Sequence, residues 1–78
     1  MKAKEISVLQ ALGVRVKQLR NERTMTQQEL ADEADVMRYI IANIERGVAN
    51  PTTTTLYAIS KALQVSLSEL MDFKVPKK

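Results

Sequence analysis

The sequence predicts an all-α protein, a compact bundle of five helices in a single domain that spans residues 1–78. Apolar residues recur at steps of three and four along the chain, which is the spacing of one face of a helix. Two Ser/Thr-x-x-Glu patterns mark helix N-termini. No segment alternates in the manner of a strand, and 78 residues allow only one small domain. We expect residues 1–6 and 74–78 to form flexible tails.

The first helix is predicted to run from about Ser7 to about Glu22. Gly13 lies inside this segment and lowers helix stability slightly without ending the helix. A stripe of apolar residues at helical spacing indicates the face that is buried. These residues are Leu9, Leu12, Val16 and Leu19.

The second helix begins at Thr26, because Thr followed three residues later by Glu29 forms a capping box. It continues to Ala34. Asp35 and Val36 form the turn that follows, since Asp tolerates the left-handed backbone conformation better than most residues. The spacing thus predicts a short helix that ends in a tight turn.

A third helix fits Met37 to about Arg46, and Gly47 is well placed after its C-terminus. Pro51 then forces a loop, and a fourth helix starts near Thr52 or Thr53. A second capping box, Ser66 to Glu69, opens a short last helix. The apolar faces of these three helices are Ile40, Ile41 and Ile44; Leu56, Ile59 and Leu63; and Leu67, Leu70 and Met71.

The composition excludes several classes of function. The chain has no Cys and no His, which removes disulfides, thiolate ligands, and the commonest general base and zinc ligand. We therefore expect no enzyme activity, no cofactor and no metal, and interpret the carboxylates of residues 29–35 as a solvated face. No apolar run is long enough for a membrane span, and the N-terminus lacks a signal-peptide pattern, so a cytoplasmic location is expected. The net charge of +3 favours a nucleic-acid partner only weakly.

Residues 26–46 carry the functional signal, because two short helices joined by a tight turn are typical of a helix-turn-helix. Apolar side chains occupy the inner face of the second of these helices, which leaves a polar outer face. Arg there can contact guanine and Asn adenine with two hydrogen bonds each, and a small Ala can touch a thymine methyl group. The N-terminus of the preceding helix offers free N–H groups to a phosphate. The outer-face residues are Arg38, Tyr39, Ala42, Asn43 and Arg46, and the N-terminal residues are Thr26, Gln27 and Gln28.

The stretch Gln28-Glu29-Leu30-Ala31-Asp32-Glu33-Ala34, followed by Ile44-Glu45-Arg46-Gly47 and Asn50-Pro51, resembles the phage repressor and Cro type of helix-turn-helix domain. The resemblance covers about residues 8–73 and implies the lambda-repressor-like DNA-binding fold. The compact size and the short last helix are most similar to the controller proteins of restriction–modification systems.

This resemblance implies roles for matching positions. Arg20 and Glu45 match a structural salt bridge between the first and third helices. Base contacts are expected from Arg38, Tyr39, Ala42 and Asn43, and phosphate contacts from Thr26, Gln27, Gln28, Arg46 and Asn50. A homodimer interface is expected from Leu67, Leu70, Met71 and Phe73.

The chain departs from the family pattern at several positions, among them Thr24, Asp35, Gln64 and Met37. Thr24, Asp35 and Gln64 stand where Gly is usual, and β-branched Thr24 is awkward if that position needs a positive φ. Met37 stands where a Ser, Thr or Asp often caps the recognition helix. We therefore expect the N-terminus of that helix to fray.

These observations predict a sequence-specific transcription regulator that binds double-stranded DNA in the major groove as a homodimer on a palindromic operator. Restriction–modification or phage-type genes are the expected targets, and RNA polymerase is a partner that such a regulator blocks or recruits. The alternative is a protein-interaction module, such as an antitoxin that binds a toxin, with a weak or secondary DNA role. Two residue-level alternatives stay open: Arg38 and Asn43 as ordinary solvated side chains, and the apolar residues of the last helix as plain core.

Overall fold

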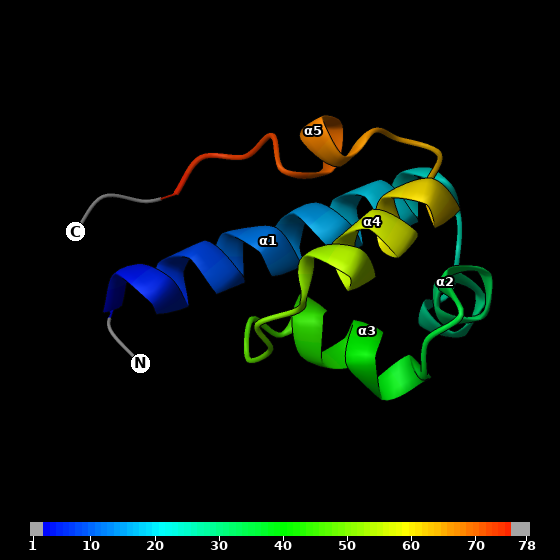
Figure 1. The fold of residues 1–78 in the computed structure, drawn as a ribbon, viewed down its shortest axis with the longest axis horizontal. Helices are drawn as coiled ribbons and strands as arrows, with labels where there is room; N and C mark the ends of the chain where they lie inside the picture. Colours follow the sequence, from blue (N-terminus) through cyan, green and yellow to red (C-terminus); the bar gives the residue numbers. More distant parts are fainter. Residues whose placement is uncertain (1–2, 76–78) are drawn as a thin grey trace.

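The computed structural model describes residues 3–75, and within this range it contains the five helices that the apolar spacing predicts. α1 lies along the length of the molecule, between α5 and the C-terminal segment on one side and α3 on the other (Figure 1). None of the described helices is long and apolar enough to cross a membrane. The helices are α1 (Ala3–Glu22), α2 (Gln27–Ala34), α3 (Arg38–Glu45), α4 (Thr53–Ala62) and α5 (Leu67–Leu70).

All five helices contribute to one hydrophobic core, and the predicted apolar faces lie against it except at Met71, which is 40% exposed. The α1 stripe is buried as expected, with Val16 at its centre fully enclosed. α2 contributes small Ala31 and Ala34, which allow α3 to approach closely. The core residues are Leu12, Val16, Leu19, Leu30, Ala31, Ala34, Ile41, Ile44, Ile59, Ala62, Leu63 and Leu70.

The N-terminal end of α1 differs from the prediction. The helix begins at Ala3 instead of Ser7, so a flexible tail is wrong for residues 3–6. No helix-breaking residue separates Ala3 from Ser7, and Glu5 in the first turn interacts favourably with the helix dipole. The remaining tail residues, 1–2 and 76–78, lie outside the described residues, and Lys74 and Val75 are not helical.

Side chains of the predicted capping residues close three helix N-termini. Thr26 Oγ1 accepts from the Glu29 N–H at 3.0 Å, and Glu29 Oε1 accepts from the Thr26 N–H at 2.8 Å, as in a capping box. Ser66 and Glu69 form the same pair at α5. Two hydrogen bonds from Ser66 lower the pKa of the Glu69 carboxyl group. The backbone N–H of Ser66 has the larger effect and its hydroxyl the smaller one. Thr52 caps α4.

Three tight turns place residues other than glycine in the left-handed backbone region. The φ angles of Thr24, Asp35 and Gln64 are 53°, 58° and 60°. The prediction for Asp35 is therefore confirmed. The backbone N–H groups of Asp35 and Val36 donate hydrogen bonds to carbonyl groups at the end of α2. Such a conformation costs an L-residue about 1–2 kcal/mol, whereas glycine, which has no Cβ atom, adopts it without this cost.

The last helix corrects one part of the predicted dimer interface. Leu70 is fully buried in the core of the same chain, so its assignment to a surface between two copies is wrong. In a helix of four residues, the spacing of apolar residues cannot distinguish burial in the core of one chain from burial between two chains, because apolar side chains occur in both. Leu67 and Phe73 are half-buried against the core, and Met71 is 40% exposed.

Candidate nucleic-acid interface

The predicted helix-turn-helix is present, and its turn is built from backbone hydrogen bonds. The Asp35 N–H and the Val36 N–H both donate to carbonyls of the last turn of α2, Val36 to Ala31 at 3.0 Å. Val36 is half-buried and packs against the core, which fixes the angle between the two helices. α3 then buries Ile41 and Ile44 against α1 and α2.

The outer face of α3 is formed by the residues predicted for base contact. Arg38 and Tyr39 are exposed, and the Tyr39 side chain is 57% accessible. Ala42 and Asn43 are half-buried one turn further along. The structure therefore brings the four predicted base-contact residues to one solvent-facing side of one helix, which is the arrangement that a major-groove reader requires.

Asn43 and Arg46 form a pair on this face. Arg46 Nη2 donates to Asn43 Oδ1 at 2.6 Å. Because a double contact with adenine uses both the carbonyl and the amide nitrogen of Asn, this pair has to open before Asn43 can make it. No sequence pattern indicates this pair, because it depends on the rotamers of two surface side chains.

The N-terminus of α2 lies beside α3 and has two backbone N–H groups to offer. Thr26 already accepts from Glu29, through its hydroxyl, and from Leu30, through its carbonyl. A helix leaves its first N–H groups without helical partners, so those of Gln27 and Gln28 are the ones available to a phosphate oxygen. The Gln28 side chain donates to Asp32 Oδ1 at 2.8 Å on the exposed face of α2.

The Gln27 side chain links two other residues of the site. Its Nε2 donates to Glu45 Oε1 at 3.0 Å, and its Oε1 accepts from Arg38 Nη1 at 3.2 Å. Gln27 is half-buried, and both polar atoms of its side chain are used within the chain. A phosphate contact by Gln27 thus falls to its backbone N–H, while its side chain orients Arg38. No sequence signal reports this link, because it needs the relative position of α2 and α3.

Glu45 and Arg20 form the salt bridge that the resemblance implied. Arg20 Nε and Nη2 donate to the two Glu45 carboxylate oxygens at 2.7 and 3.0 Å, and Nη1 donates to the Met25 carbonyl at 2.7 Å. The side chains are only 11% and 4% exposed. The hydrogen bond to Glu45 raises the pKa of Arg20, and the pair ties α1 to the end of α3.

Both glycines of the chain lie where the C-terminal end of α3 meets α1. A Cβ atom on Gly13 would lie 2.4 Å from the Ile44 carbonyl oxygen and 2.7 Å from that of Glu45. A Cβ on Gly47 would lie 2.9 Å from the Gln10 Cα, and its φ is +75°. The expectation that Gly13 is merely a small helix cost misses this close contact, because a glycine inside a helical pattern does not reveal what packs on it.

Asn50, the remaining predicted phosphate contact, is exposed in the loop between α3 and α4. This loop begins just after the end of α3 that packs closely on α1 at Gly13 and Gly47. That contact therefore also sets where the loop lies relative to the outer face of α3. Among the residues described, no three acidic, His or Cys side chains converge in a way that would hold a metal ion.

Comparisons with known proteins agree with this geometry. Residues 16–70 match the model of the helix-turn-helix family. The control protein C.BamHI of Bacillus amyloliquefaciens is 42% identical over 62 residues, which are 78% of this chain and 76% of that protein. The immunity repressor of Bacillus phage phi105 is 40% identical over 60 residues, 77% of this chain but only 42% of the repressor, so the chain matches less than half of that relative. The restriction–modification controller protein C.AhdI from Aeromonas hydrophila has a TM-score of 0.78 at 27% identity, with 80% of this chain and 94% of that one covered.

Proposed function

Because the chain belongs to the helix-turn-helix family, we propose that it is a sequence-specific DNA-binding transcription regulator that places α3 in the major groove. The observation that carries this proposal is the division of α3 into two faces. Ile41 and Ile44 are buried in the core, while the four predicted base-contact residues lie on the opposite side of the helix, which faces solvent. The names of the relatives, repressors and control proteins, support regulation over catalysis.

Base recognition falls to the outer face of α3. Arg38 supplies the planar, two-pronged donor that matches guanine, and Gln27 holds it from the side. Ala42 is small enough to let the helix backbone approach and to touch a thymine methyl group. Asn43 reads adenine once Arg46 releases its carbonyl and turns to a phosphate. Tyr39 contacts the rim of the groove.

Phosphate contacts position this face. The backbone N–H groups of Gln27 and Gln28, aided by the Thr26 hydroxyl, bind one strand at the N-terminus of α2. Arg46 and Asn50 bind phosphates at the other end of α3. Contacts at both ends of the recognition helix fix its register on the duplex without reading sequence.

The regulator acts as a homodimer on a palindromic operator, with half-sites about 34 Å apart. It works at DNA in the cytoplasm, and restriction–modification or phage-type genes are its targets, in line with the named relatives. Occupying a promoter blocks RNA polymerase or recruits it. A toxin partner has no support from a particular contact or surface of the described residues, so an antitoxin role is an outcome of the test below.

The test is selection of bound sites from a random DNA library with the full chain. We expect a two-fold symmetric consensus and a binding constant that falls with salt at a log–log slope of about −0.9 per phosphate contacted. Arg38→Ala should cost about 1–3 kcal/mol on the consensus and relax preference at one base per half-site. Arg23→Ala, an exposed arginine in the turn after α1 that is not among the proposed contacts, is the matched control. No DNA binding at low salt would contradict the proposal and favour a protein-interaction module.

A further inference from the structure

Two large apolar side chains are exposed at the N-terminal end of α3, beside the arginine proposed to read guanine. Met37, the N-cap residue, is 65% exposed, and Tyr39 is 57% exposed. Arg38 lies between them in the chain. The N-terminal residues of a recognition helix are those that contact base edges. An apolar side chain at this end of α3 therefore faces the DNA groove when the protein is bound.

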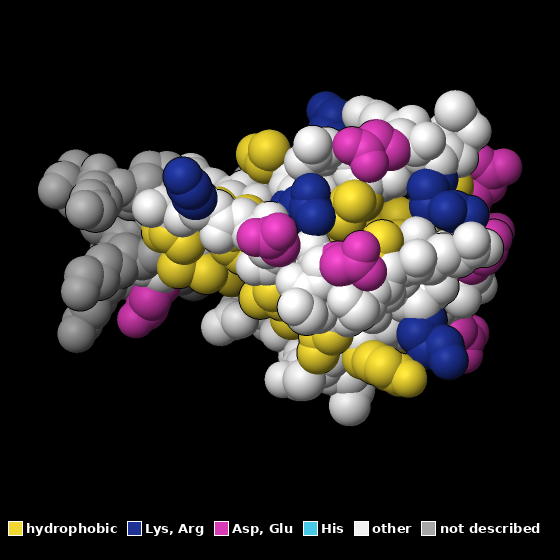
Figure 2. Space-filling model, turned by 90° about the horizontal axis from the view of Figure 1, so that it is seen from above, with side chains coloured by type: hydrophobic (Ala, Val, Ile, Leu, Met, Phe, Trp, Pro, Cys, Tyr) yellow, Lys and Arg dark blue, Asp and Glu magenta, His cyan; other side chains and the backbone are white. Residues whose placement is uncertain are grey.

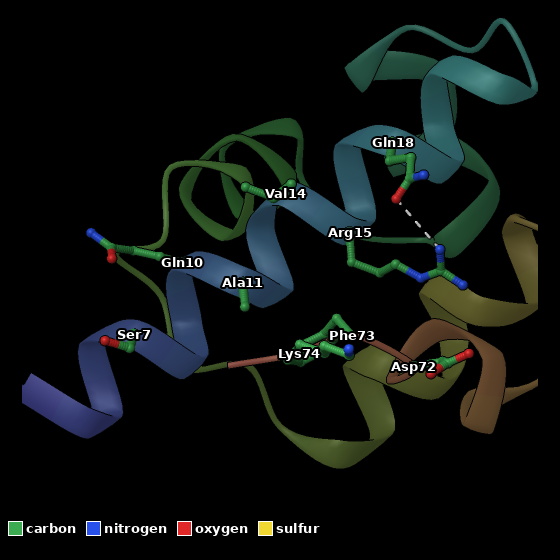
Figure 3. A pocket seen from close by; sticks show the side chains of 9 residues that line it. All are labelled: Ser7, Gln10, Ala11, Val14, Arg15, Gln18, Asp72, Phe73 and Lys74. Atoms are coloured by element: carbon green, nitrogen blue, oxygen red, sulfur yellow. Dashed lines mark hydrogen bonds between the residues drawn. The ribbon is translucent and has the colours of Figure 1, made fainter. Parts of the chain in front are cut away.

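Other exposed apolar side chains of the molecule have a different setting. Val14, 68% exposed, lies on α1 beside a shallow groove between this helix and the segment after α5 (Figure 3). Figure 2 shows the face that carries α5, where hydrophobic side chains lie among charged ones of both signs. Apolar residues scattered over a surface in this way are normal and require no partner. Met37 differs, because the proposed function brings DNA to the surface on which it lies.

Met37 contributes to neither the cap of α3 nor the core. Its side chain makes no capping hydrogen bond, although Ser, Thr or Asp at an N-cap would supply one and stabilise the helix. At 65% exposure it also buries little surface within the chain. The flanking apolar residues Val36 and Ile40, by contrast, both pack against the core. The apolar side chain of Met37 is therefore one that the domain itself does not use.

The backbone on both sides of Met37 is held in place. The Val36 N–H donates to the Ala31 carbonyl at 3.0 Å, and the Met37 carbonyl accepts from the Ile40 N–H at 3.0 Å. The Met37 side chain thus extends from a fixed point of the chain. Its unbranched, polarisable end can adjust to the shape of a small apolar group.

The base edges of the major groove present one kind of apolar group, the 5-methyl group of a pyrimidine. Thymine carries this methyl group, and cytosine carries it only when it is methylated at C5. The other atoms on these edges are hydrogen-bond donors and acceptors, and the backbone offers charged phosphates. A thioether side chain that faces the groove is therefore complementary to the pyrimidine methyl group.

The neighbouring Arg38 defines which pyrimidine Met37 reaches. Arg38 Nη1 donates to Gln27 Oε1 of α2 at 3.2 Å, which holds the guanidinium in the site. Consecutive Cα atoms lie about 3.8 Å apart, close to the spacing of about 3.4 Å between base pairs. Two consecutive side chains thus reach two adjacent base pairs. If Arg38 binds a guanine, Met37 lies at the pair next to it.

We propose that Met37 is a specificity-determining residue, which reads the 5-methyl group of the pyrimidine in the base pair next to the guanine bound by Arg38. The inference rests on the DNA-binding function proposed above and adds a residue to its contacts, since Ala42 lies about one turn further along α3. Met37 contacts the methyl group and no other atom of the base. Methylation of cytosine at C5 in that pair therefore raises affinity, which makes the methylation state of the operator an input to regulation.

Binding of the wild-type chain to variants of the site selected from the random library tests this proposal. The guanine is the base at which Arg38→Ala relaxes preference, and we expect thymine in the pair beside it. Replacing this thymine by deoxyuridine in both half-sites removes only the methyl groups. Burial of one methyl group corresponds to about a fourfold change in affinity, so two half-sites give about 15-fold. Equal affinities with and without the methyl groups would overturn the proposal.

A second pair of DNA sites separates the two bases that carry the methyl group. With a C·G pair at the same position in both half-sites, 5-methylcytosine should bind about 15-fold more tightly than cytosine. A response to the thymine methyl group without a response to 5-methylcytosine would show that the base and not the methyl group is read, which contradicts the proposal.

Variants at position 37 assign the effect to this side chain. Met37→Ser should bind the thymine and deoxyuridine sites equally, although the new cap keeps the domain folded. Met37→Leu, which keeps an apolar side chain of similar size, should retain the preference for the methyl group. Val14→Ala, a change at an exposed apolar residue of α1, is the matched control and should retain it fully. If Tyr39→Ala abolishes the preference and Met37→Ser does not, Tyr39 reads the methyl group and the proposal is wrong.

The same measurements separate this inference from the proposed function. Wild-type chain that binds its selected site but does not distinguish thymine from deoxyuridine would overturn the role of Met37 and leave the DNA-binding function standing. Wild-type chain that binds no DNA at low salt would overturn both, and the exposed Met37 would then belong to a surface for a protein partner.

Discussion

At its C-terminal end α3 rests directly on α1, whereas at its N-terminal end no side chain caps it. Gly13 lets the carbonyls of Ile44 and Glu45 lie against the α1 backbone, and the buried Arg20–Glu45 pair holds the same end. At the other end Met37 makes no capping hydrogen bond and is 65% exposed. Both ends belong to a helix of only eight residues.

This difference shows how one short helix can be both fixed and adaptable. The anchored end sets the height and angle of α3 above the rest of the domain through backbone contact, which side-chain motion cannot relax. The uncapped end carries Arg38, whose contact within the chain is a hydrogen bond to Gln27. Arg38 and Tyr39 thus lie at the end that the fold holds less tightly, whereas Asn43 lies next to the anchored end.

Arg20→Ala should break the anchored end most severely. It leaves the Glu45 carboxylate, 4% exposed, without its cationic partner, and removal of one member of a buried pair costs about 3–5 kcal/mol. Urea denaturation followed by circular dichroism measures the loss. Arg23→Ala, at an exposed position just after α1, should change stability by less than about 0.5 kcal/mol. Similar effects for the two arginines would show that the pair does not anchor α3.

Gly13→Ala should destabilise the domain by about 1–3 kcal/mol, although alanine is the better helix former. The expected change in stability is opposite to the one that helix propensity predicts. The added Cβ would clash with a backbone carbonyl oxygen of α3, and only backbone movement can relieve this clash. Thermal unfolding measures the change, with Lys17→Ala as the exposed control on the same helix. A stabilised Gly13→Ala variant would refute the close contact.

Thr24→Gly should stabilise the domain by about 1 kcal/mol, because glycine adopts a φ of 53° without strain while a β-branched side chain does not. Asp35→Gly, in the turn before α3, should gain less, since Asp tolerates that region better. Denaturation midpoints of the two variants rank the strain on either side of α2. A larger gain at Asp35 would place the greater strain next to the recognition helix.

Met37→Ser should stabilise the N-terminal end of α3 by about 0.5–1 kcal/mol, because it supplies the missing cap. Amide hydrogen exchange should slow in the first turn of α3, at Tyr39 and Ile40, and stay unchanged near Ile44. Met37→Ala is the control that removes the methionine without adding a cap. Equal exchange in both variants would mean that the end is held by other contacts.

Sequence patterns predicted most of the fold because each pattern depends on neighbours along the chain. The capping boxes at Thr26 and Ser66, the turn at Asp35 and the apolar stripe of α1 follow from local spacing, and all are present. Leu70 was misassigned because burial within a chain and burial between chains require the same apolar residue. The start of α1 was placed too late because its first turns carry little of the apolar stripe on which the prediction relied.

For the candidate site, the sequence by itself determined which side chains face outward on α3, since helical periodicity alone separates Arg38 and Asn43 from Ile41 and Ile44. Only the tertiary structure decided how these side chains are held. The Gln27 link between Arg38 and Glu45, the Asn43–Arg46 pair and the α1 surface against Gly13 join residues from different helices or fix one rotamer among several. A helical period specifies the direction of a side chain around its own axis but not the distance to a neighbouring helix, and that distance sets these contacts.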